Sequence, residues 1–389
     1  NSDGYLAKLS SNLGALLWST YLGGVSNDAA YAIEFANDGN LLIGGGTQSS
    51  NFNVGSNSSA DNSWNGETDG FLLKISASNF SILGGTFVGT PEYDQVYFVQ
   101  TDLSDNIYCL GQTAGDMPIS PGLYGQLNSG QFIRKFNSNL SSIVWNTTIG
   151  TGSGEIDISP TAFLVSDCNQ IYFSGWGGHT NSITCMSLTC QAFSSTTLNL
   201  PTTSDAFQST TDGSDFYLAV LNADATSLEY GSFLGGASSA EHVDGGTSRF
   251  DKSGSVYQAV CAGCQNNDDF PTTPGAWSSV NGSTGCNLGV FRFDLGQLEA
   301  IASVEGPTTL CVGVPAQFTN GTIGATDYVW SFGDNTTSLL FEPQHTYNQP
   351  GTYTIQLMVS DDNGCYEDDS VTLQLDVIVF TPPTVDPVA

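Results

Sequence analysis

Histidine and the acids beside it are the residues with which this chain of 389 residues could move protons. Residues 241–244 read Glu-His-Val-Asp, which places a base between two carboxylates. Side chains alternate between the two faces of a strand, so only His242 and Asp244 can share a site, and no nucleophile follows at a suitable spacing. His179 lies in a Gly-rich segment without a second His or carboxylate at metal-ligand spacing, and we interpret it as a solvated loop residue.

The carboxylates raise the question of calcium or glycoside chemistry. Oxygen-rich runs occur at residues 266–269, 361–363 and 367–369, but none has the Asp-x-Asp-x-Asp-Gly spacing of a calcium loop. Glycoside hydrolysis needs two facing carboxylates, and a sequence with 38 acids does not single out such a pair. We therefore predict no enzyme activity, no catalytic or metal-binding residues and no cofactor. Calcium stays an open alternative, with no ligands named.

The cysteines favour disulfides over zinc. The chain has nine cysteines and three histidines, and Cys261 and Cys264, which have metal-like spacing, lack a second pair at a suitable distance. Disulfides in an oxidising compartment fit better, and we predict one bridge among Cys261, Cys264 and Cys286. The odd count leaves a thiol over, for which Cys109, in an apolar strand, is the candidate. The pairing of Cys168 is left open.

The charge balance excludes some partners. Seven Lys and Arg face 38 Asp and Glu, a formal net charge of -31, and such a field repels nucleic acid and anionic membranes. We interpret it as a solvated acidic surface, ahead of a dedicated cation-binding surface. No apolar run approaches the roughly 20 residues that span a bilayer. Asn1 opens without a start Met or a signal peptide, which favours an interior piece of a longer protein.

Short strands that recur through residues 1–300 must position these side chains. An alternating strand follows a small or polar residue at five places, beginning at Asp3, Asp69, Gly130, Asp215 and Asn287. A polar turn leads into an apolar strand at four places, residues 37–42, 104–108, 166–172 and 251–257. The first repeat predicts strands over residues 4–10, 16–22, 30–36 and 41–47. Four strands per repeat at a loose period predict β-propeller blades.

These pieces together resemble a known repeat. They read Asp-Gly-Tyr-Leu-Ala-Lys-Leu at 3–9, Thr-Tyr-Leu-Gly-Gly at 20–24, Ser-Gly-Ser-Val-Tyr at 253–257 and Phe-Pro-Thr-Thr-Pro-Gly-Ala at 270–276. Residues 1–302 thereby resemble SBBP β-propeller repeats. Five alternating strands against four polar-turn strands predict an arc of about four and a half blades, completed by polypeptide before Asn1. An insertion after Gly178 interrupts the third repeat, and we pair its Cys185 with Cys190.

The acids of the polar turns are expected to be structural. Asp38, Asp105, Asp167 and Asp251 are assigned to one repeated turn position, where short polar side chains accept hydrogen bonds from turn amides. We therefore expect no convergence of buried carboxylates and no catalytic constellation in residues 1–300.

Residues 303–379 have sequence motifs that differ from those of the repeats. Alternation over residues 353–359 and 371–377 predicts the inward faces of a sandwich. Spaced Trp-x-Phe-Gly-Asp and His-x-Tyr motifs make this segment resemble a PKD domain, an immunoglobulin-like β-sandwich, with motif residues Trp330, Gly333, Asp334, His345, Tyr347, Gly351 and Tyr353. The resemblance implies a structural His345 and a disulfide between Cys311 and Cys365. Residues 380–389 read as a stiff Pro-rich linker.

The predicted fold is all-β, a propeller segment followed by a sandwich. This combination resembles the very large proteins that gliding bacteria export by type IX secretion. The resemblance implies a non-enzymatic secreted or cell-surface adhesin or scaffold with further domains on both sides. Its expected partner is a surface polysaccharide or protein, with no nucleic acid and no membrane span. The alternative is a secreted carbohydrate-binding or carbohydrate-degrading propeller with the PKD module as a spacer.

Overall fold

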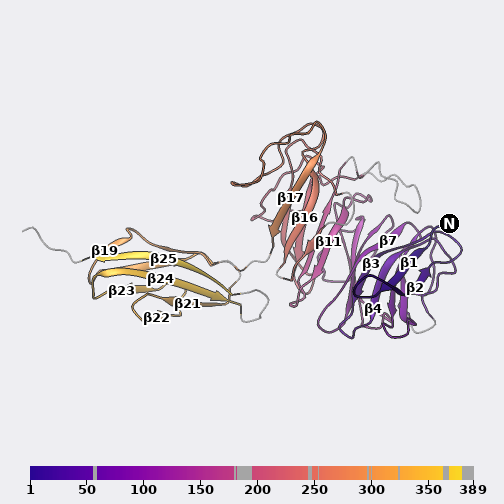
Figure 1. Cartoon of the computed structure of the whole chain (residues 1–389), viewed down its shortest axis with the longest axis horizontal. Coiled ribbons are helices and arrows are strands. Elements are labelled where there is room, and N and C mark those ends of the chain that lie inside the picture. Colours follow the sequence, from indigo (N-terminus) through magenta and orange to yellow (C-terminus); the bar gives the residue numbers. More distant parts are fainter. Residues whose placement is uncertain are drawn as a thin grey trace, which may run out of the picture. The chain divides into compact units, whose positions relative to one another are not determined.

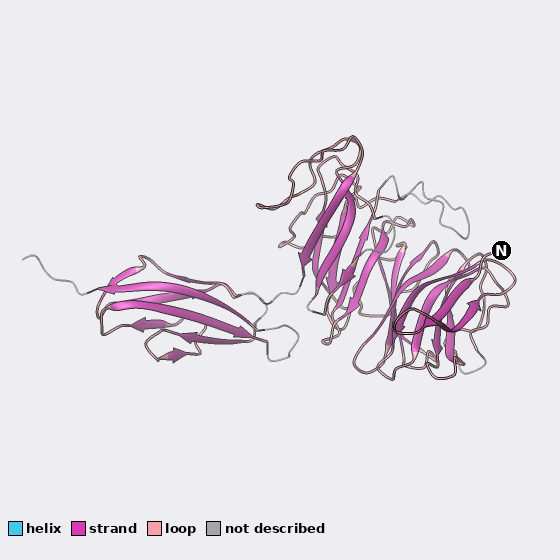
Figure 2. Cartoon of the chain, in the orientation of Figure 1, coloured by secondary structure: helices cyan, strands magenta, loops and turns pink. Residues whose placement is uncertain are grey.

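The computed structural model describes residues 1–55, 59–178, 181, 195–243, 248–252, 254–295, 298, 300–322, 325–361 and 368–378. They fall into two compact units, residues 1–295 and 296–389, both built of strands (Figures 1 and 2). The division lies a few residues before the expected boundary at 302, and the expected linker, 380–389, lies outside the described residues. Among these residues no helix has the length and apolarity that crossing a bilayer requires.

The described residues of the first unit form seventeen strands. They are β1 (Gly4–Leu9), β2 (Leu16–Leu22), β3 (Asp28–Phe35), β4 (Leu41–Thr47), β5 (Asp69–Ile75), β6 (Ile82–Val88), β7 (Asp94–Thr101), β8 (Ile107–Thr113), β9 (Gln131–Phe136), β10 (Ile143–Ile149), β11 (Ser159–Val165), β12 (Ile171–Trp176), β13 (Phe216–Leu221), β14 (Leu228–Leu234), β15 (Arg249–Phe250), β16 (Ser255–Ala262) and β17 (Asn287–Asp294). The four strands predicted for the first repeat correspond to β1–β4, to within two residues at each end.

These strands form five antiparallel sheets. Their orders are β1-β2, β3-β4-β5-β6, β10-β9-β8-β7, β11-β12-β13-β14 and β15-β16-β17. Each four-stranded sheet therefore joins the last two strands of one repeat to the first two of the next. Within the described residues β1 pairs with β2 and β17 with β16, so the sheets do not close and a propeller is not established. β17 pairs with β16 along its whole length, so residues 288–294 belong to a sheet and are not left over from the repeats.

The central strands of the full sheets are buried on both faces. All residues of β4, β5 and β8 are buried, which is why these strands read as continuous apolar or Gly-rich runs rather than as alternating ones. Neighbouring sheets pack through their first strands, since β7 contacts β3 and β4, and β11 contacts β7 and β8. The sheet β1-β2 contacts β3 on one side, and among the described strands it has no neighbouring sheet on its other side.

The polar turns share a backbone rather than an aspartate. In each turn the fourth residue has a positive φ and donates its N–H to the carbonyl of the first, and these fourth residues are Gly39, Asp105, Asn169 and Gly254. On that alignment the four aspartates stand at different positions, so the expectation of one repeated position is wrong. Asp38 accepts the N–H of Asn40 (3.0 Å), whereas Asp105 accepts the N–H of Asn37 from another turn (2.9 Å). Gly, Asn and Asp recur because they tolerate positive φ.

The second unit is a two-sheet sandwich. Its strands are β18 (Ala302–Val304), β19 (Thr309–Cys311), β20 (Pro315–Asn320), β21 (Asp327–Ser331), β22 (Thr337–Ser338), β23 (Gln344–Thr346), β24 (Gly351–Ser360) and β25 (Asp369–Ile378). The sheets run β18-β20-β23 and β19-β25-β24-β21-β22, with β19 parallel to β25. Ile355, Leu357 and Val359 point into the core around Trp330 and Phe318, in agreement with the predicted alternation.

Candidate functional site

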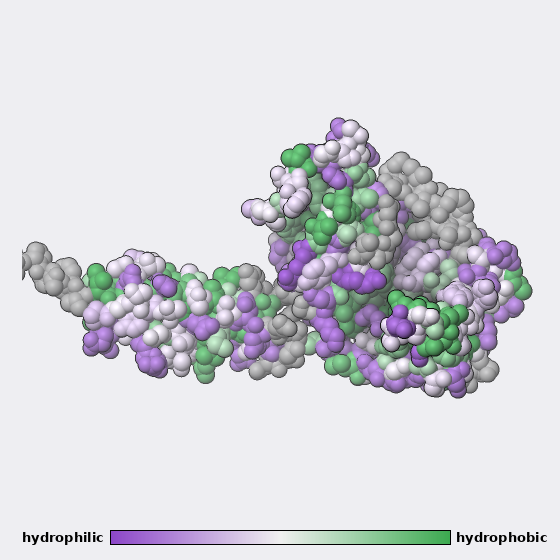
Figure 3. Space-filling model, viewed as in Figure 1, coloured by the Kyte–Doolittle hydropathy of each residue, from purple (hydrophilic) through white to green (hydrophobic). Residues whose placement is uncertain are grey.

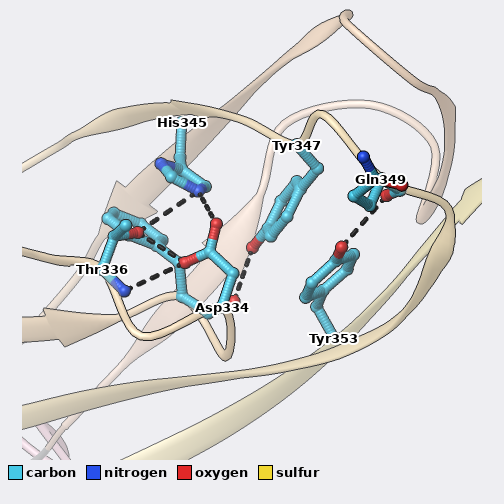
Figure 4. Close-up of polar contacts among 7 residues, drawn as sticks. Asp334, Thr336, His345, Tyr347, Gln349 and Tyr353 are labelled. Atoms are coloured by element: carbon cyan, nitrogen blue, oxygen red, sulfur yellow. Dashed lines mark hydrogen bonds and ion pairs between the residues drawn. The ribbon is translucent and has the colours of Figure 1, made fainter.

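The histidine of the sandwich is paired with the aspartate of its turn. Gly333 has a φ of 77° and turns the chain after β21, which brings Asp334 to His345 of β23 (Figure 4). Oδ2 of Asp334 lies 2.8 Å from Nε2 of His345, and its Oδ1 accepts the N–H (3.1 Å) and the hydroxyl (2.5 Å) of Thr336. Partial burial opposes ionisation, but the hydrogen bonds from Thr336 and His345 hold the pKa of Asp334 below its ordinary value.

Aromatic rings enclose this pair. The His345 ring stacks on Phe332 with centroids 4.1 Å apart and meets Tyr347 edge-on at 4.6 Å. The Tyr347 hydroxyl donates to the Phe332 carbonyl (3.0 Å), and the Tyr353 hydroxyl donates to the Gln349 carbonyl (3.0 Å) (Figure 4). Four of the expected motif residues, Asp334, His345, Tyr347 and Tyr353, thus meet in one network, and both tyrosine hydroxyls donate to the domain's own backbone. Trp330, another of them, donates to the Phe341 carbonyl instead. Oγ1 of Thr336 also lies 3.4 Å from Nε2 of His345, but this is the same ring nitrogen that contacts Asp334, so the imidazole does not link the carboxylate to the hydroxyl through its two nitrogens, and the arrangement orders a turn.

The cysteines divide among three situations. Cys264 and Cys286 form a disulfide, as expected for one pair among the three cysteines of that region. Cys109 is fully buried in β8, and burial raises the pKa of its thiol to about 12, which agrees with an inert thiol. Cys168 is disulfide-bonded. The predicted pair Cys185–Cys190 lies outside the described residues.

The expected disulfide of the sandwich requires correction. Cys311 is a free thiol, and its register partner in the parallel ladder is Ile378, the last residue of β25. The chain enters β25 at Asp369, at the other end of a ten-residue strand that spans roughly 30 Å at about 3.3 Å per residue. Cys365, which lies outside the described residues, precedes that far end in sequence. The expectation that both cysteines lie at one end of the sandwich overlooked the parallel direction of β19.

The oxygen-rich run at 266–269 serves the loop that carries it. Asp269 accepts the N–H (2.8 Å) and hydroxyl (2.9 Å) of Ser238, and Asp268 accepts the N–H of Asn281 (2.5 Å). In the second and third runs, residues 362, 363 and 367 lie outside the described residues, as do His179 and Asp244. Asp369, in the third run, accepts the N–H of Ala300 (2.9 Å). Calcium therefore stays an untested alternative.

Buried carboxylates converge in the first unit, against expectation. Asp69, at the start of β5, and Asp94, at the start of β7, are both fully buried, and a methyl group on Gly89 would lie 3.0 Å from Oδ1 of Asp69 and 3.2 Å from Oδ2 of Asp94. Burial, and secondarily the neighbouring acid Asp94, raises the pKa of Asp69 to about 7, and burial raises that of Asp94 to about 6. A second pair, Asp215 and Glu241, repeats this arrangement.

The second pair shows the same electrostatics. Burial raises the pKa of Asp215 to about 6, with the neighbouring Asp212 as a further cause, and burial raises the pKa of Glu241 to about 8, with the neighbouring Asp215 as a further cause. Sequence reasoning missed both pairs because their members come from different strands. The signal was present in the aspartates that open the alternating strands, Asp3, Asp69 and Asp215, each followed at a similar interval by another acid.

The second acid of each set has a common structural task. Asp28 accepts the N–H of Gly24 (2.7 Å), Asp94 that of Thr90 (2.5 Å), Asp157 that of Thr151 (2.9 Å) and Glu241 that of Gly236 (3.3 Å). Each acid thus ties down the connection from the last strand of one sheet to the first strand of the next. Two apolar or mixed cavities of the described residues, one at Tyr124 and Thr151 and one at Leu6 and Phe35, are lined by no carboxylate. The buried acids therefore brace the connections between neighbouring sheets.

The second unit defines an immunoglobulin-like β-sandwich of the PKD type. Residues 299–377 match the family described as PKD domain. Collagenase ColA of Bacillus cereus is 39% identical over 69 residues, which is 16% of this chain and 7% of the collagenase, so the chain spans a small part of that relative. These matches fit an extracellular multidomain protein.

Solved structures give weaker similarities. The PKD1 domain of the Vibrio cholerae metalloprotease PrtV is 24% identical, with a TM-score of 0.18 over 21% of this chain and 96% of that domain. The extracellular domain of the one component system BT4673 from B. thetaiotaomicron is 8% identical, with a TM-score of 0.24 over 93% of this chain and 57% of that domain. None of these matches supports SBBP repeats, gliding or type IX secretion, which stay expectations from the sequence.

Proposed function

We propose that this chain is a non-enzymatic, extracellular interaction module in which residues 1–295 form an open arc of propeller blades. The observation that carries the proposal is apolar surface left uncovered on β1, β2 and β3, which belong to two neighbouring sheets. Ile33 in β3 is 58% exposed, whereas Val99, the residue at the same place in β7, is 3% exposed. Tyr5 in β1 is 53% exposed, whereas Phe71 at the same place in β5 is fully buried.

The uncovered surface is made of side chains from three strands. Its exposed side chains are Tyr5, Leu9, Leu16, Leu17, Tyr21, Tyr31, Ile33 and Phe35. They lie on β1, β2 and β3, where Figure 3 shows hydrophobic residues gathered on the surface. An apolar cavity of about 270 Å³ opens between β1 and β3, lined by Leu6, Trp18 and Phe80 among others. Contiguous apolar surface of this kind marks an interaction site on a soluble protein.

The occupant is inferred from the other sheets of the same chain. In each four-stranded sheet the strand equivalent to β1 pairs on one side with the strand equivalent to β2 and on the other with a Gly-rich or apolar strand such as β4. The β1 edge is missing that second neighbour among the described strands. A hairpin of the β3-β4 type would pair with β1 and cover Ile33 and Phe35, as β7 covers β4. We therefore infer a further pair of repeat strands as the occupant. A second copy of this chain does not fit, because its last sheet ends in β17, which already holds the place of β1.

A fusion tests this arrangement. Residues 28–68, which form the β3-β4 hairpin and its connection to β5, are placed directly before Asp3 of the full chain, so that the copied hairpin is in phase with β1. Burying each large apolar side chain contributes about 1.5–3 kcal/mol, so the urea midpoint of the first unit should rise clearly. The same fusion carrying Ile33→Asp and Phe35→Asp in the original β3 is the control and should lose most of the gain.

Two results would contradict the proposal. One is an unchanged urea midpoint in the fusion, and the other is a dimer of the unfused chain, detected by sedimentation, that Ile33→Asp dissolves. Turnover of a polysaccharide by the intact chain, abolished by Asp69→Asn, would overturn the non-enzymatic assignment itself.

Carbohydrate binding is the second candidate, because one loop presents an aromatic ring to solvent. Trp277, which follows Phe-Pro-Thr-Thr-Pro-Gly-Ala, is fully exposed, and exposed indole faces stack on apolar surfaces of ligands. A glycan array probed with the chain and with Trp277→Ala tests it. Selective signals that the substitution removes would favour a lectin-like module, and signals equal for both proteins would exclude Trp277.

A further inference from the structure

Four side chains with metal-binding atoms meet near the end of β16. His242 and Cys261 face each other across an antiparallel bridge, in which the N–H of Cys261 donates to the His242 carbonyl (2.9 Å) and the N–H of His242 donates back (3.2 Å). A ring nitrogen of His242 and the Sγ atoms of Cys261 and Cys286 all lie within 4.8 Å of one another. Nδ1 of His242 lies 3.8 Å from Sγ of Cys264, the disulfide partner of Cys286.

Hydrogen bonds between side chains and the backbone hold these residues together independently of the disulfide. The Asn281 amide donates to the carbonyls of Gly263 (2.8 Å) and Gly285 (3.2 Å), which joins the turn before Cys264 to the residue before Cys286. The Asn267 amide donates to the Cys264 carbonyl (3.0 Å), and Glu241 accepts the N–H of Gly263 (3.4 Å). Opening the sulfur–sulfur bond therefore leaves the cluster in place.

The ligand set is that of a structural zinc site. Zinc prefers four tetrahedral ligands, with Zn–S near 2.3 Å and Zn–N near 2.0 Å, which puts ligand atoms roughly 3.4–3.8 Å apart. Three sulfurs and one imidazole match that preference, whereas calcium and magnesium prefer oxygen. The Trp176 ring lies 5.8 Å from the His242 ring, so the imidazole is packed on one side by an apolar neighbour.

We propose that His242, Cys261, Cys264 and Cys286 form a Cys3His zinc site that the Cys264–Cys286 disulfide closes and that reduction opens. A dithiol reductant gives two electrons and two protons to the sulfur–sulfur bond and is itself oxidised to a disulfide. Zn²⁺ then displaces the thiol protons, and the three cysteines bind as thiolates beside the neutral imidazole. The oxidised chain lacks two of these ligands and holds zinc at least a hundredfold more weakly.

The sequence argued against zinc because Cys261 and Cys264 lack a second close Cys pair. The fold supplies the missing ligands from two distant segments. His242 arrives through the bridge to Cys261, and Cys286 arrives at the start of β17, which pairs with β16 in a register that sets Leu288 against Cys261. Ligand spacing along the chain could not have shown this.

The test is a metal titration of the full chain in both redox states. The chain is reduced with a dithiol under argon, freed of reductant, and titrated with Co²⁺, whose thiolate charge-transfer and d–d absorption report tetrahedral sulfur ligation. We expect one Co²⁺ per reduced chain, displaced by Zn²⁺, and X-ray absorption of the zinc form with three sulfurs and one nitrogen. The oxidised chain should show no thiolate band.

Variants locate the site. Cys261→Ser leaves the disulfide intact in the oxidised chain, so its folding can be checked there, and after reduction it should weaken Co²⁺ binding at least tenfold. His242→Asn should change the charge-transfer band and the nitrogen count, while Cys311→Ser, a thiol in the other unit, is the matched control and should change nothing. The proposal is overturned if the reduced, folded chain takes up no stoichiometric Co²⁺, or if Cys261→Ser and His242→Asn bind it as the unchanged chain does.

Discussion

Two carboxylate sites, one in each unit, respond to their surroundings in opposite ways. In the first unit Asp69 and Asp94 are buried together, and their pKa values are raised because burial disfavours charge. In the second unit Asp334 lies near the surface beside His345 and Thr336, and its pKa is lowered. The difference teaches that a high acid content does not set one electrostatic behaviour for the whole chain. The Asp69–Asp94 pair and the Asp334 turn should therefore respond to pH with opposite signs, and each unit should respond to mutation on its own.

A core substitution in one unit is the strongest test of whether the two units unfold independently. Trp330 is fully buried between the sheets of the sandwich and donates its Nε1–H to the Phe341 carbonyl (3.3 Å). We expect Trp330→Ala to cost the second unit about 3–5 kcal/mol, because the cavity cannot collapse around so large a loss. Hydrogen exchange followed by mass spectrometry in the intact chain measures each unit separately. Leu339→Ala, at an exposed position, is the control. Equal loss of protection in both units would contradict their independence.

The next largest effect is expected at the paired acids Asp69 and Asp94, which should make the stability of the first unit depend on pH. The folded pKa of Asp69 is about 7, above its ordinary value of 3.8, so the folded state binds the proton more tightly than the unfolded state. The stabilisation from this proton is complete below about pH 4 and is lost as the pH rises toward and through 7. The first unit should therefore be more stable at pH 5 than at pH 8.

Asp69→Asn removes the contribution of this group to the pH dependence. The amide keeps an acceptor for the Asn65 N–H (2.7 Å) and can donate to Asp94, so the substitution should raise stability at pH 8 by on the order of 1–3 kcal/mol and make the profile between pH 4 and 7 less steep, while Asp94, Asp215 and Glu241 still titrate. Urea unfolding at several pH values measures it. Asp116→Asn, at an exposed acid, should leave the profile as it is. A profile of the Asp69→Asn protein as steep as that of the unchanged chain would show that the pair does not titrate in this window.

Period-two alternation made much of the fold predictable, and long-range register made the sites unpredictable. Ile355, Leu357 and Val359 alternate within one strand, so the buried face of β24 can be predicted from the sequence of that strand alone. The meeting of His242 with Cys261 depends on a bridge between segments, and the meeting of Asp69 with Asp94 depends on which strands begin side by side. The parallel direction of β19 likewise could not be read from the sequence near it, which is why the partner of Cys311 was wrongly assigned.

The smallest effect is expected at the surface pair of the second unit. Asp334 gains hydrogen bonds from Thr336 and His345 in the folded state, and its lowered pKa means that this stabilisation is present above the ordinary value of 3.8 and is lost as the pH falls through and below it. Asp334→Ala should cost the sandwich about 1 kcal/mol at pH 7, because the groups are partly exposed and water replaces the lost acceptor, and almost nothing at pH 2. His345→Gln keeps the ring position polar and should lose less. Hydrogen exchange of residues 330–347 measures both variants. Since the first unit is weakened by rising pH and this turn by falling pH, a loss at pH 2 equal to that at pH 7 would mean that Asp334 acts through its shape rather than through its charge.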